Sequence, residues 1–463
     1  MKHGKKALSL LQEESSASVW SRSRLVGLCI PLMLEQILAF AVGMVDTVMV
    51  AKIDEAAMSG VSLVDSVNFL LIALFSAMAT GGAVVCSQYL GRKEPEKASE
   101  AARQLIYLVT IISTVIMALA LVFRVPMLKL IYGQLEADVM ENALIYLLVT
   151  ALSFPFLAIY NGGAALFRSM SNSQVSMKIS LAMNLINFVG NYIGIFILHQ
   201  GVLGAAIPTL ISRMFAALLI THLLCRPDCD PIHLRGLSRI RLDREHIRTI
   251  TKIGIPSGVE GSIFQVGKIL VTRLIADFGK ASIAAYAASS ALGTFVNVPG
   301  TAIGLAMVTV VGQCIGARDY AAAKRYTRQL LLTSMASMGV LSLALYLFRY
   351  PLVGIFSSLS AEGRAIAVST LVIIAAASPI FWSTSFALPA ALRATGDAKF
   401  TMLVSIFSMW TFRIGFAYLL ATRMGMGVPG VWLAMVIDWI VRSTFFIARW
   451  LRGRWQEHQL ISG

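Results

Sequence analysis

Apolar residues run in long segments from one end of the chain to the other. Each segment reaches about 20 residues, the length that an α-helix needs to cross the hydrocarbon core of a bilayer. The pattern therefore predicts an all-α membrane protein with twelve transmembrane helices, placed near residues 25–51, 59–85, 104–124, 140–161, 176–198, 203–224, 251–277, 281–312, 328–348, 365–388, 400–420 and 429–450.

The longest polar interruption divides these segments into two blocks of six, so we expect two six-helix bundles. The expected parts are a cytoplasmic N-terminal segment (1–24), an N-lobe with helices 1–6 (25–225), a cytoplasmic linker (226–250), a C-lobe with helices 7–12 (251–450) and a cytoplasmic C-terminal tail (451–463).

The two blocks are repeats of each other. One constant shift of the numbering, which we call the repeat offset, pairs identical residues without a gap: Pro31 with Pro256, Glu35 with Glu260, Thr47 with Thr272, Gln88 with Gln313, Gly91 with Gly316, Pro126 with Pro351, and Arg168 with Arg393. Because each repeat has an even number of spans, both enter the membrane in the same sense. A pseudo-two-fold axis along the membrane normal is expected to relate them. A cavity between two such halves, open to one side at a time, is a physical basis for alternating access.

Composition excludes the soluble classes of protein. Hydrophobic residues make up 57% of the chain, charged residues 14%, and the mean hydropathy is +0.75. A soluble protein needs far more polar surface than this. The net charge of +15 does not indicate nucleic acid, because the basic residues lie in short loops between the apolar segments. No metalloprotease, nucleophile-elbow or P-loop motif occurs. We therefore predict neither an enzyme nor a bound cofactor or structural metal.

The basic residues also predict the orientation. With the N-terminus inside, the inner loops and both ends carry about 28 Lys and Arg against about 7 in the outer loops. The positive-inside rule then places both termini in the cytoplasm. We expect a multi-pass protein of the cytoplasmic membrane that works as a monomer.

Several motifs occupy defined places in this duplicated chain. They are IPLMLEQ…GMVDTVMVA in the first span, GxPxxxE at the start of the seventh, QYLGR and QCIGAR after the second and eighth, and NFVGNYIGIFIL with GVLGAAIPTLISR in the fifth and sixth. Together they resemble the bacterial branch of the multidrug and toxic compound extrusion (MATE) transporters, and the resemblance covers nearly the whole chain.

The resemblance implies a MATE fold and a cation-coupled antiporter. Such a protein exports small organic compounds, often cationic drugs or metabolites, while Na⁺ or H⁺ flows inward. An alternative with the same architecture is a flippase for lipid-linked saccharide, which belongs to a related superfamily. A flippase is expected to have a strongly basic cavity for pyrophosphate, whereas the interior charges of this chain have both signs.

Asp46 lies in the first span, about five residues from its end. A charged side chain at the centre of a bilayer costs at least about 2.5–3.5 kcal/mol unless it is paired or ligated, so Asp46 is a candidate functional residue. The alternative is an aspartate close enough to the outer surface to be solvated. Asp46 matches the acid of the family's first-helix motif, which in the family binds the coupling cation.

Two asparagines of the fifth span, Asn187 and Asn191, are four residues apart and share one helix face. In the family, the matching side chains join the acid of the first helix, and Thr209 matches a hydroxyl ligand of the same cluster. The resemblance therefore implies that Asp46, Asn187, Asn191 and Thr209 form the cation or proton coupling site. The alternative is that the asparagines only link helices through hydrogen bonds.

The repeat places Glu35 and Glu260 in equivalent positions, about one turn after a proline. We expect both to face the cavity and Glu260 to contribute to recognising cationic cargo or to proton exchange. The alternative is that they pair with loop arginines. Gln265 lies beside the position where many family members carry an acid, so we add it to the candidate cavity residues. Lys268, near the middle of the seventh span, is a further one, and we expect it to pair across the second bundle.

Arg413 and Asp438 fall inside the eleventh and twelfth spans. Neither charge can face lipid at low cost. We expect them to form an ion pair within the C-lobe.

Overall fold

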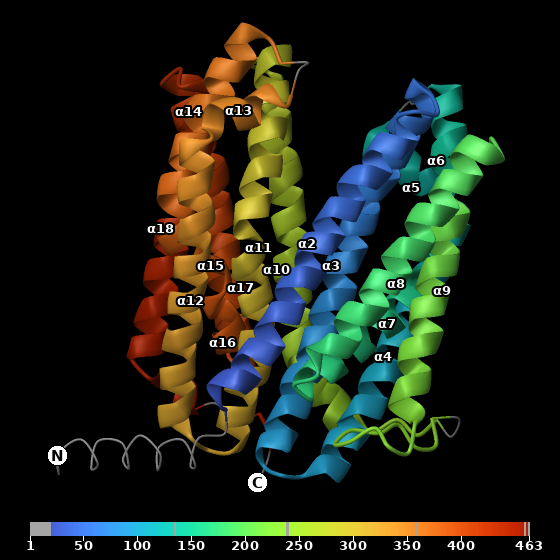
Figure 1. The fold of residues 1–463 in the computed structure, drawn as a ribbon, viewed down its shortest axis with the longest axis vertical. Coiled ribbons are helices and arrows are strands. Elements are labelled where there is room, and N and C mark those ends of the chain that lie inside the picture. Colours follow the sequence, from blue (N-terminus) through green and yellow to red (C-terminus); the bar gives the residue numbers. More distant parts are fainter. Residues whose placement is uncertain (1–19, 134–135, 238–239, 357–358, 458–459, 462–463) are drawn as a thin grey trace.

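The computed structural model describes residues 20–133, 136–237, 240–356, 359–457 and 460–461, which are largely helical. Parts of the predicted N-terminal segment (1–19), linker (238–239) and tail (458–459, 462–463) lie outside the described residues. Figure 1 shows two bundles that stand side by side, touch at the end where the chain begins and finishes, and diverge toward the other. We call these the termini end and the far end.

The first bundle, the N-lobe, begins with a serine cap, since the Ser21 hydroxyl accepts from the Arg24 amide. Asp54 caps the next helix in the same way. The helices are α2 (Arg22–Val50), α3 (Glu55–Gly91), α4 (Pro95–Val122), α5 (Arg124–Tyr132), α6 (Ala137–Leu152), α7 (Phe154–Ser169), α8 (Ser173–Tyr192), the π-helical η1 (Ile193–Ile197) and α9 (Leu203–Cys225). α6 and α7 form one span, bent by 46° next to Pro155, because a proline inside a helix removes a backbone hydrogen bond.

The second bundle, the C-lobe, starts at Arg244, one to two turns before the start of the predicted seventh span. Its helices are α10 (Arg244–Ala276), α11 (Lys280–Gly316), α12 (Tyr320–Leu347), α13 (Arg349–Gly354), α14 (Ala361–Ala377), η2 (Ser378–Trp382), α15 (Ser383–Phe386), α16 (Leu388–Ala394), α17 (Ala398–Ser408), η3 (Met409–Gly415), η4 (Tyr418–Arg423), α18 (Gly427–Leu451) and the short η5 (Arg454–Glu457). The segments η2, η3 and η4 are π-helical turns that interrupt two long spans.

The structure reproduces the repeat seen in the sequence. The repeat offset carries the first and last residues of α3 and α4 onto those of α11 and α12. The turns that follow α3 and α11 also match, since Lys93 and Arg318 both have a positive φ, of 62° and 59°. The predicted register therefore holds at the level of single turns.

The number of membrane-crossing helices agrees with the twelve predicted. Among the described residues, ten helices are long and apolar enough to cross a bilayer, and the bent α6–α7 pair makes eleven. The twelfth is α10, a 33-residue helix whose hydropathy is lowered by charged residues such as Glu260 and Lys268. Together they form the predicted all-α fold with two six-helix bundles.

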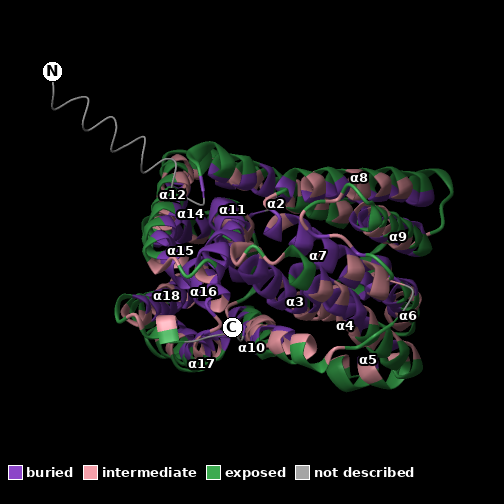
Figure 2. Cartoon of the chain, turned by 90° about the horizontal axis from the view of Figure 1, so that it is seen from below, coloured by how far each residue is buried: buried purple, intermediate pink, exposed green. Residues whose placement is uncertain are grey.

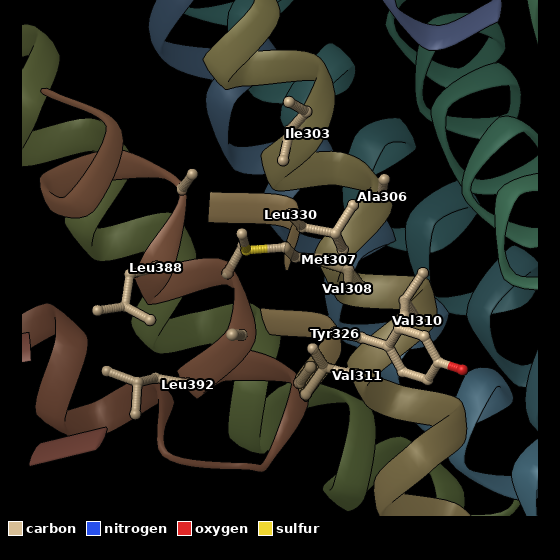
Figure 3. Packing of buried hydrophobic residues seen from close by; sticks show 14 of the residues in the cluster. Ile303, Ala306, Met307, Val308, Val310, Val311, Tyr326, Leu330, Leu388 and Leu392 are labelled. Carbon is tan, nitrogen blue, oxygen red and sulfur yellow. The ribbon is translucent and has the colours of Figure 1, made fainter. Parts of the chain in front are cut away.

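The buried core explains why the lobes touch at one end only. At the termini end, one cluster joins Leu28 and Leu32 of α2 to residues of α3, α11, α12 and α16. Figure 3 shows its packing around α11, α12 and α16. At the far end, each lobe has its own core. Seen from the termini end in Figure 2, α3, α11 and α16 are mostly buried, while α5, α8 and α9 expose their outer faces.

Two reciprocal hydrogen bonds close the interface at the termini end. Nε2 of Gln88 in α3 donates to the Ala394 carbonyl of the C-lobe at 2.8 Å. Nε2 of Gln313 in α11 donates to the Ser169 carbonyl of the N-lobe at 2.9 Å. The repeat offset relates the two donors to each other and the two acceptors to each other, so the pseudo-two-fold axis passes between the bonds.

Candidate functional site

A cavity of about 460 Å³ lies within the N-lobe and is lined by residues of α2, α3, α6, α7, α8 and α9. The structure brings together in it all four residues predicted for the coupling site. Asp46 comes from α2, Asn187 and Asn191 from α8, and Thr209 from α9. Asn187 and Asn191 share one face of α8, as expected from their spacing.

Hydrogen bonds link three helices around the Asp46 carboxylate. Nδ2 of Asn191 donates to Oδ1 of Asp46 at 3.0 Å. The Asn187 amide places one of its two polar atoms 3.0 Å from the Thr209 hydroxyl and the other 2.9 Å from Oδ2 of Asp46. Asp46 is therefore held at its two oxygens by two different asparagines.

The orientation of the Asn187 amide depends on the charge of Asp46. With nitrogen toward Asp46, the amide donates to both oxygens of a charged carboxylate, at 2.9 and 3.2 Å. With oxygen toward Asp46, two acceptors face each other, so a proton on Asp46 or a cation between the two oxygens is required. In that second arrangement Nδ2 of Asn187 donates to Thr209. The site can thus hold a charged or a neutral Asp46.

The cavity also contains a second carboxylate that the sequence analysis did not single out. Asp65 of α3 accepts from Nδ2 of Asn68 at 3.2 Å and interacts with the Tyr146 hydroxyl and the Arg213 guanidinium. The same signal that identified Asp46, a lone acid in a long apolar helix, would have found Asp65. The site therefore holds two acids and one buried arginine.

Two side-chain oxygens in the cavity have no hydrogen-bond donor among the described residues. They are Oδ1 of Asn191 and Oδ1 of Asn68, and both atoms are buried. Buried polar atoms are normally satisfied by protein or by ordered water. Together with the carboxylates they provide the oxygen-rich environment that hard cations prefer.

The first predicted cavity acid, Glu35, is instead buried in a polar cluster of the N-lobe. Its carboxylate lies 3.7 Å from Nη1 of Arg168 and accepts from the Ser176 hydroxyl at 3.0 Å. Only 7% of the residue is exposed. The prediction that Glu35 faces the cavity is therefore wrong, because its carboxylate is buried against Arg168 in the last turn of α7.

Glu260 repeats this arrangement in the C-lobe with more partners. Its carboxylate lies 3.2 Å from Arg393 and 3.6 Å from Arg442, and it accepts from Ser405 at 2.7 Å and from Thr401 at 3.4 Å. A cationic cargo would have to compete with two arginines. Glu260 is therefore paired with two arginines of the C-lobe, and its expected role in recognising cationic cargo or in proton exchange stays a prediction.

Lys268 and Gln265 lie on the part of α10 that follows its contact with α3. Gln265 is half-buried and Lys268 is exposed. Lys268 has no acid within ion-pair distance among the described residues, so the expected pair across the C-lobe is not formed. The charged group that acts on it is Arg413, which has the same sign.

Arg413 and Asp438 form an ion pair inside the C-lobe. Nη2 and Nε of Arg413 lie 2.7 and 2.9 Å from Oδ2 of Asp438, and the Ser408 hydroxyl donates to Oδ1. Asp438 is fully buried and Arg413 is 3% exposed. The pair ties η3 to α18 where π-helical turns break the eleventh span.

Comparison with known proteins identifies the chain's relatives. It matches the MatE family over residues 31–193 and 256–419, which are the two repeats. It is 28% identical over 432 residues to the uncharacterized transporter YisQ of Bacillus subtilis, covering 92% of this chain and 93% of that one. It is 24% identical over 449 residues to the probable multidrug resistance protein NorM of Thermotoga maritima, covering 95% and 94%.

The fold also matches solved structures. A transporter of the MOP superfamily from Pyrococcus furiosus, whose binding pocket is described as having reverse polarity, superposes with a TM-score of 0.87 at 19% identity. The match covers 94% of this chain and 96% of that one. A multidrug resistance MATE transporter in an outward-facing conformation superposes with a TM-score of 0.86 at 20% identity, over 94% and 96% of the two chains.

Proposed function

Because the chain belongs to the MatE family of transporters, we propose that it is a cation-coupled antiporter that exports organic compounds across the cytoplasmic membrane. One observation carries the proposal. A carboxylate at membrane depth, Asp46, is held by two asparagines of α8 in a cavity of the N-lobe. An acid in such a place can exchange a proton or a cation with the medium.

The coupling step is the change of charge on Asp46. In the charged state Asn187 donates to both oxygens of the carboxylate, and in the neutral state the amide turns and donates to Thr209. Proton binding, or Na⁺ binding between the facing oxygens, therefore changes the hydrogen bonds that join α2, α8 and α9. A change in these bonds can favour one arrangement of the N-lobe helices over another.

The direction of transport follows from the orientation of the chain. From the basic loops we infer that both termini are cytoplasmic. In this orientation the closed termini end is the cytoplasmic side, the diverging far end is the outer side and the conformation is outward-open. An antiporter needs a second conformation, closed at the far end, and the shared core at the termini end is the part that must open.

The names of the relatives support organic compounds as cargo. Several, including that of Thermotoga maritima, are named probable multidrug resistance proteins. The relatives described above are named as a transporter or as multidrug resistance proteins, and none is named as a flippase, so the saccharide flippase is not favoured. We expect the transporter to act as a monomer with the two lobes as its moving parts.

The proposal is tested in everted membrane vesicles that contain the full chain. Uptake of a fluorescent cationic dye is measured while a Na⁺ gradient and a H⁺ gradient are imposed separately. Uptake should respond to one or both gradients, and Asp46→Asn should abolish this response while expression and dye binding persist. Asp277→Asn, which changes an exposed aspartate at the far end of α10, is the matched control. Normal coupled uptake by Asp46→Asn would place the coupling site elsewhere.

A further inference from the structure

The two lobes differ in the sign of their interior charge although they are repeats. In the N-lobe, the three acids Glu35, Asp46 and Asp65 face two arginines, since Arg168 lies beside Glu35 and Arg213 interacts with Asp65. The repeat keeps Glu35 and Arg168 as Glu260 and Arg393, but it replaces Asp46, Asp65 and Arg213 by Val271, Ser290 and Asp438. Two acids are thus lost, and one arginine is replaced by an acid.

The C-lobe interior instead carries an excess of basic groups. Its two acids, Glu260 and Asp438, are compensated by three arginines, which are Arg393, Arg413 and Arg442. Lys268 adds a further positive charge, and no described acid lies within ion-pair distance of it. The C-lobe therefore has four basic groups against two acids. An uncompensated charge at membrane depth is costly and marks a functional position.

The direction of the Lys268 side chain follows from the faces of α10. Exposed apolar residues define its lipid-facing stripe, namely Ile255, Val259, Val266, Ile269 and Leu270. At about 100° per residue, Lys268 points about 155° away from the middle of this stripe. Since Lys268 is nevertheless exposed, it opens into the space between the lobes and not into lipid.

Lys268 lies at the level of the acidic cavity of the other lobe. α3 and α10 run antiparallel, and Gly261 of α10 packs against Ala73 of α3. Lys268 lies two turns beyond Gly261, about 10 Å further along the axis of α10. The same distance from Ala73 toward the start of α3 leads to Asp65 and Ser66. A cargo molecule between the lobes at this depth would therefore meet acids on one side and Lys268 on the other.

Aromatic rings lie beside Lys268 on the C-lobe side. Phe264, one turn before it, packs edge-on against Phe386 with ring centroids 5.6 Å apart, and Phe386 stacks on Trp382 at 4.7 Å. Arg413 lies 4.8 Å from the Phe264 centroid. The rings form an apolar surface next to a free ammonium group and a buried guanidinium.

We propose that this surface binds an anionic group of the cargo, with Lys268 as the residue that contacts it and discriminates a carboxylate from a neutral group at the same place. The proposal rests on the transport function proposed above and assigns one specificity-determining residue to it. The ammonium of Lys268 binds the carboxylate, the rings of Phe264 and Phe386 contact the aromatic part, and any positive group faces the acids of the N-lobe.

The test uses two dyes that differ by one ester group, tetramethylrhodamine with a free carboxylate and its methyl ester. Binding to the purified full-length protein is measured by fluorescence anisotropy for wild type, Lys268→Gln, Lys268→Met and Lys268→Arg. Either neutral variant should weaken binding of the acid by about fivefold to tenfold, as expected for a partly solvated charged hydrogen bond. Binding of the ester should change less than twofold, and Lys268→Arg should retain the preference for the acid.

The control variant is Lys178→Gln, which removes an exposed lysine of α8 in the other lobe and should affect neither dye. The proposal is overturned if the wild-type protein does not bind the acid, or if the neutral variants weaken both dyes equally or neither. Gradient-driven uptake of the ester by wild type in vesicles tests the transport function separately. A positive uptake result with equal loss for both dyes would reject Lys268 and keep the antiporter.

Discussion

Gly81 in α3 offers a direct test of how the two lobes close at the termini end. A Cβ atom added to this glycine would lie 2.6 Å from the Ile250 carbonyl oxygen and 3.0 Å from the Gly254 amide nitrogen, both in the backbone of α10. Ordinary contacts of a Cβ atom begin near 3.4 Å. The obstacle is backbone and cannot move aside like a side chain. In Gly81→Ala, α10 must therefore retreat from α3 by several tenths of an ångström.

Overpacking of this kind costs about 1–3 kcal/mol. The cost applies only to the conformation in which the termini end is closed, so the ratio of the two conformations should change by about 5–150-fold. Spin labels on cysteines at Asp138 of α6 and Arg364 of α14, both exposed at the far end, report this ratio by electron–electron resonance. The five native cysteines are replaced beforehand.

We expect Gly81→Ala to increase the population with a short distance between the two labels, because the far end closes when the termini end opens. Gly339→Ala in α12 is the control, since nothing lies within 4 Å of its added Cβ. An unchanged distance distribution in a folded Gly81→Ala protein would show that this contact does not belong to the moving interface.

Three further predictions follow from single contacts. Glu260→Gln removes the carboxylate that contacts Arg393 and buried Arg442 and should lower stability by about 3 kcal/mol, measured as the unfolding temperature in detergent. Export of cationic and neutral compounds should fall together; selective loss of cationic cargo would support a recognition role. Arg413→Leu should cost about 3–5 kcal/mol because it removes the guanidinium in contact with buried Asp438, and changing both residues to leucine should recover most of this; equal instability of the single and double variants would contradict it. The hydrogen bond with His246 lowers the pKa of Asp243, the N-cap residue of α10. The charged cap is therefore fully present at any pH above the usual pKa range of aspartate, and it is lost as the pH falls below that range. Hydrogen exchange at the first amides of α10 should therefore be faster in Asp243→Ala by about fivefold at pH 7, for a cap of about 1 kcal/mol, and the difference should shrink as the pH falls below the usual aspartate range; a difference that does not depend on pH would exclude titration of the cap.

The sequence was sufficient to predict the repeat, the helices and the group of Asp46, Asn187, Asn191 and Thr209 that meets in one cavity of the N-lobe. Apolar length and a constant repeat offset depend only on the chain itself, and the register holds down to Lys93 and Arg318. Asp46 was found because a charged side chain is rare inside an apolar span, whereas its grouping with Asn191 came from the resemblance to the MATE family.

The partners of the remaining charges could not be predicted, because partner choice depends on tertiary packing. Arg442 comes from α18 and has no repeat counterpart, since the equivalent position is Ala217. No internal comparison therefore indicated that it would reach Glu260. Lys268 was expected to pair because a single charge in a span usually does, and it opens instead toward the other lobe. The π-helical turns of the eleventh span likewise have no signature in the apolar pattern.

The two glutamine bonds at the termini end have the form of contacts in a symmetric homodimer. In such an isologous interface, residue i of one subunit contacts residue j of the other, and j contacts i. When the repeat offset is subtracted from the numbers of the C-lobe residues, Gln313 becomes position 88 and Ala394 becomes position 169. Both bonds therefore join position 88 of one repeat to position 169 of the other. One repeat therefore carries both surfaces needed to bind a copy of itself. A short ancestral gene encoding six helices could have produced a paired membrane protein before duplication and fusion joined the copies, and the opposite polarity of the two lobes is a difference that only the fused chain could acquire.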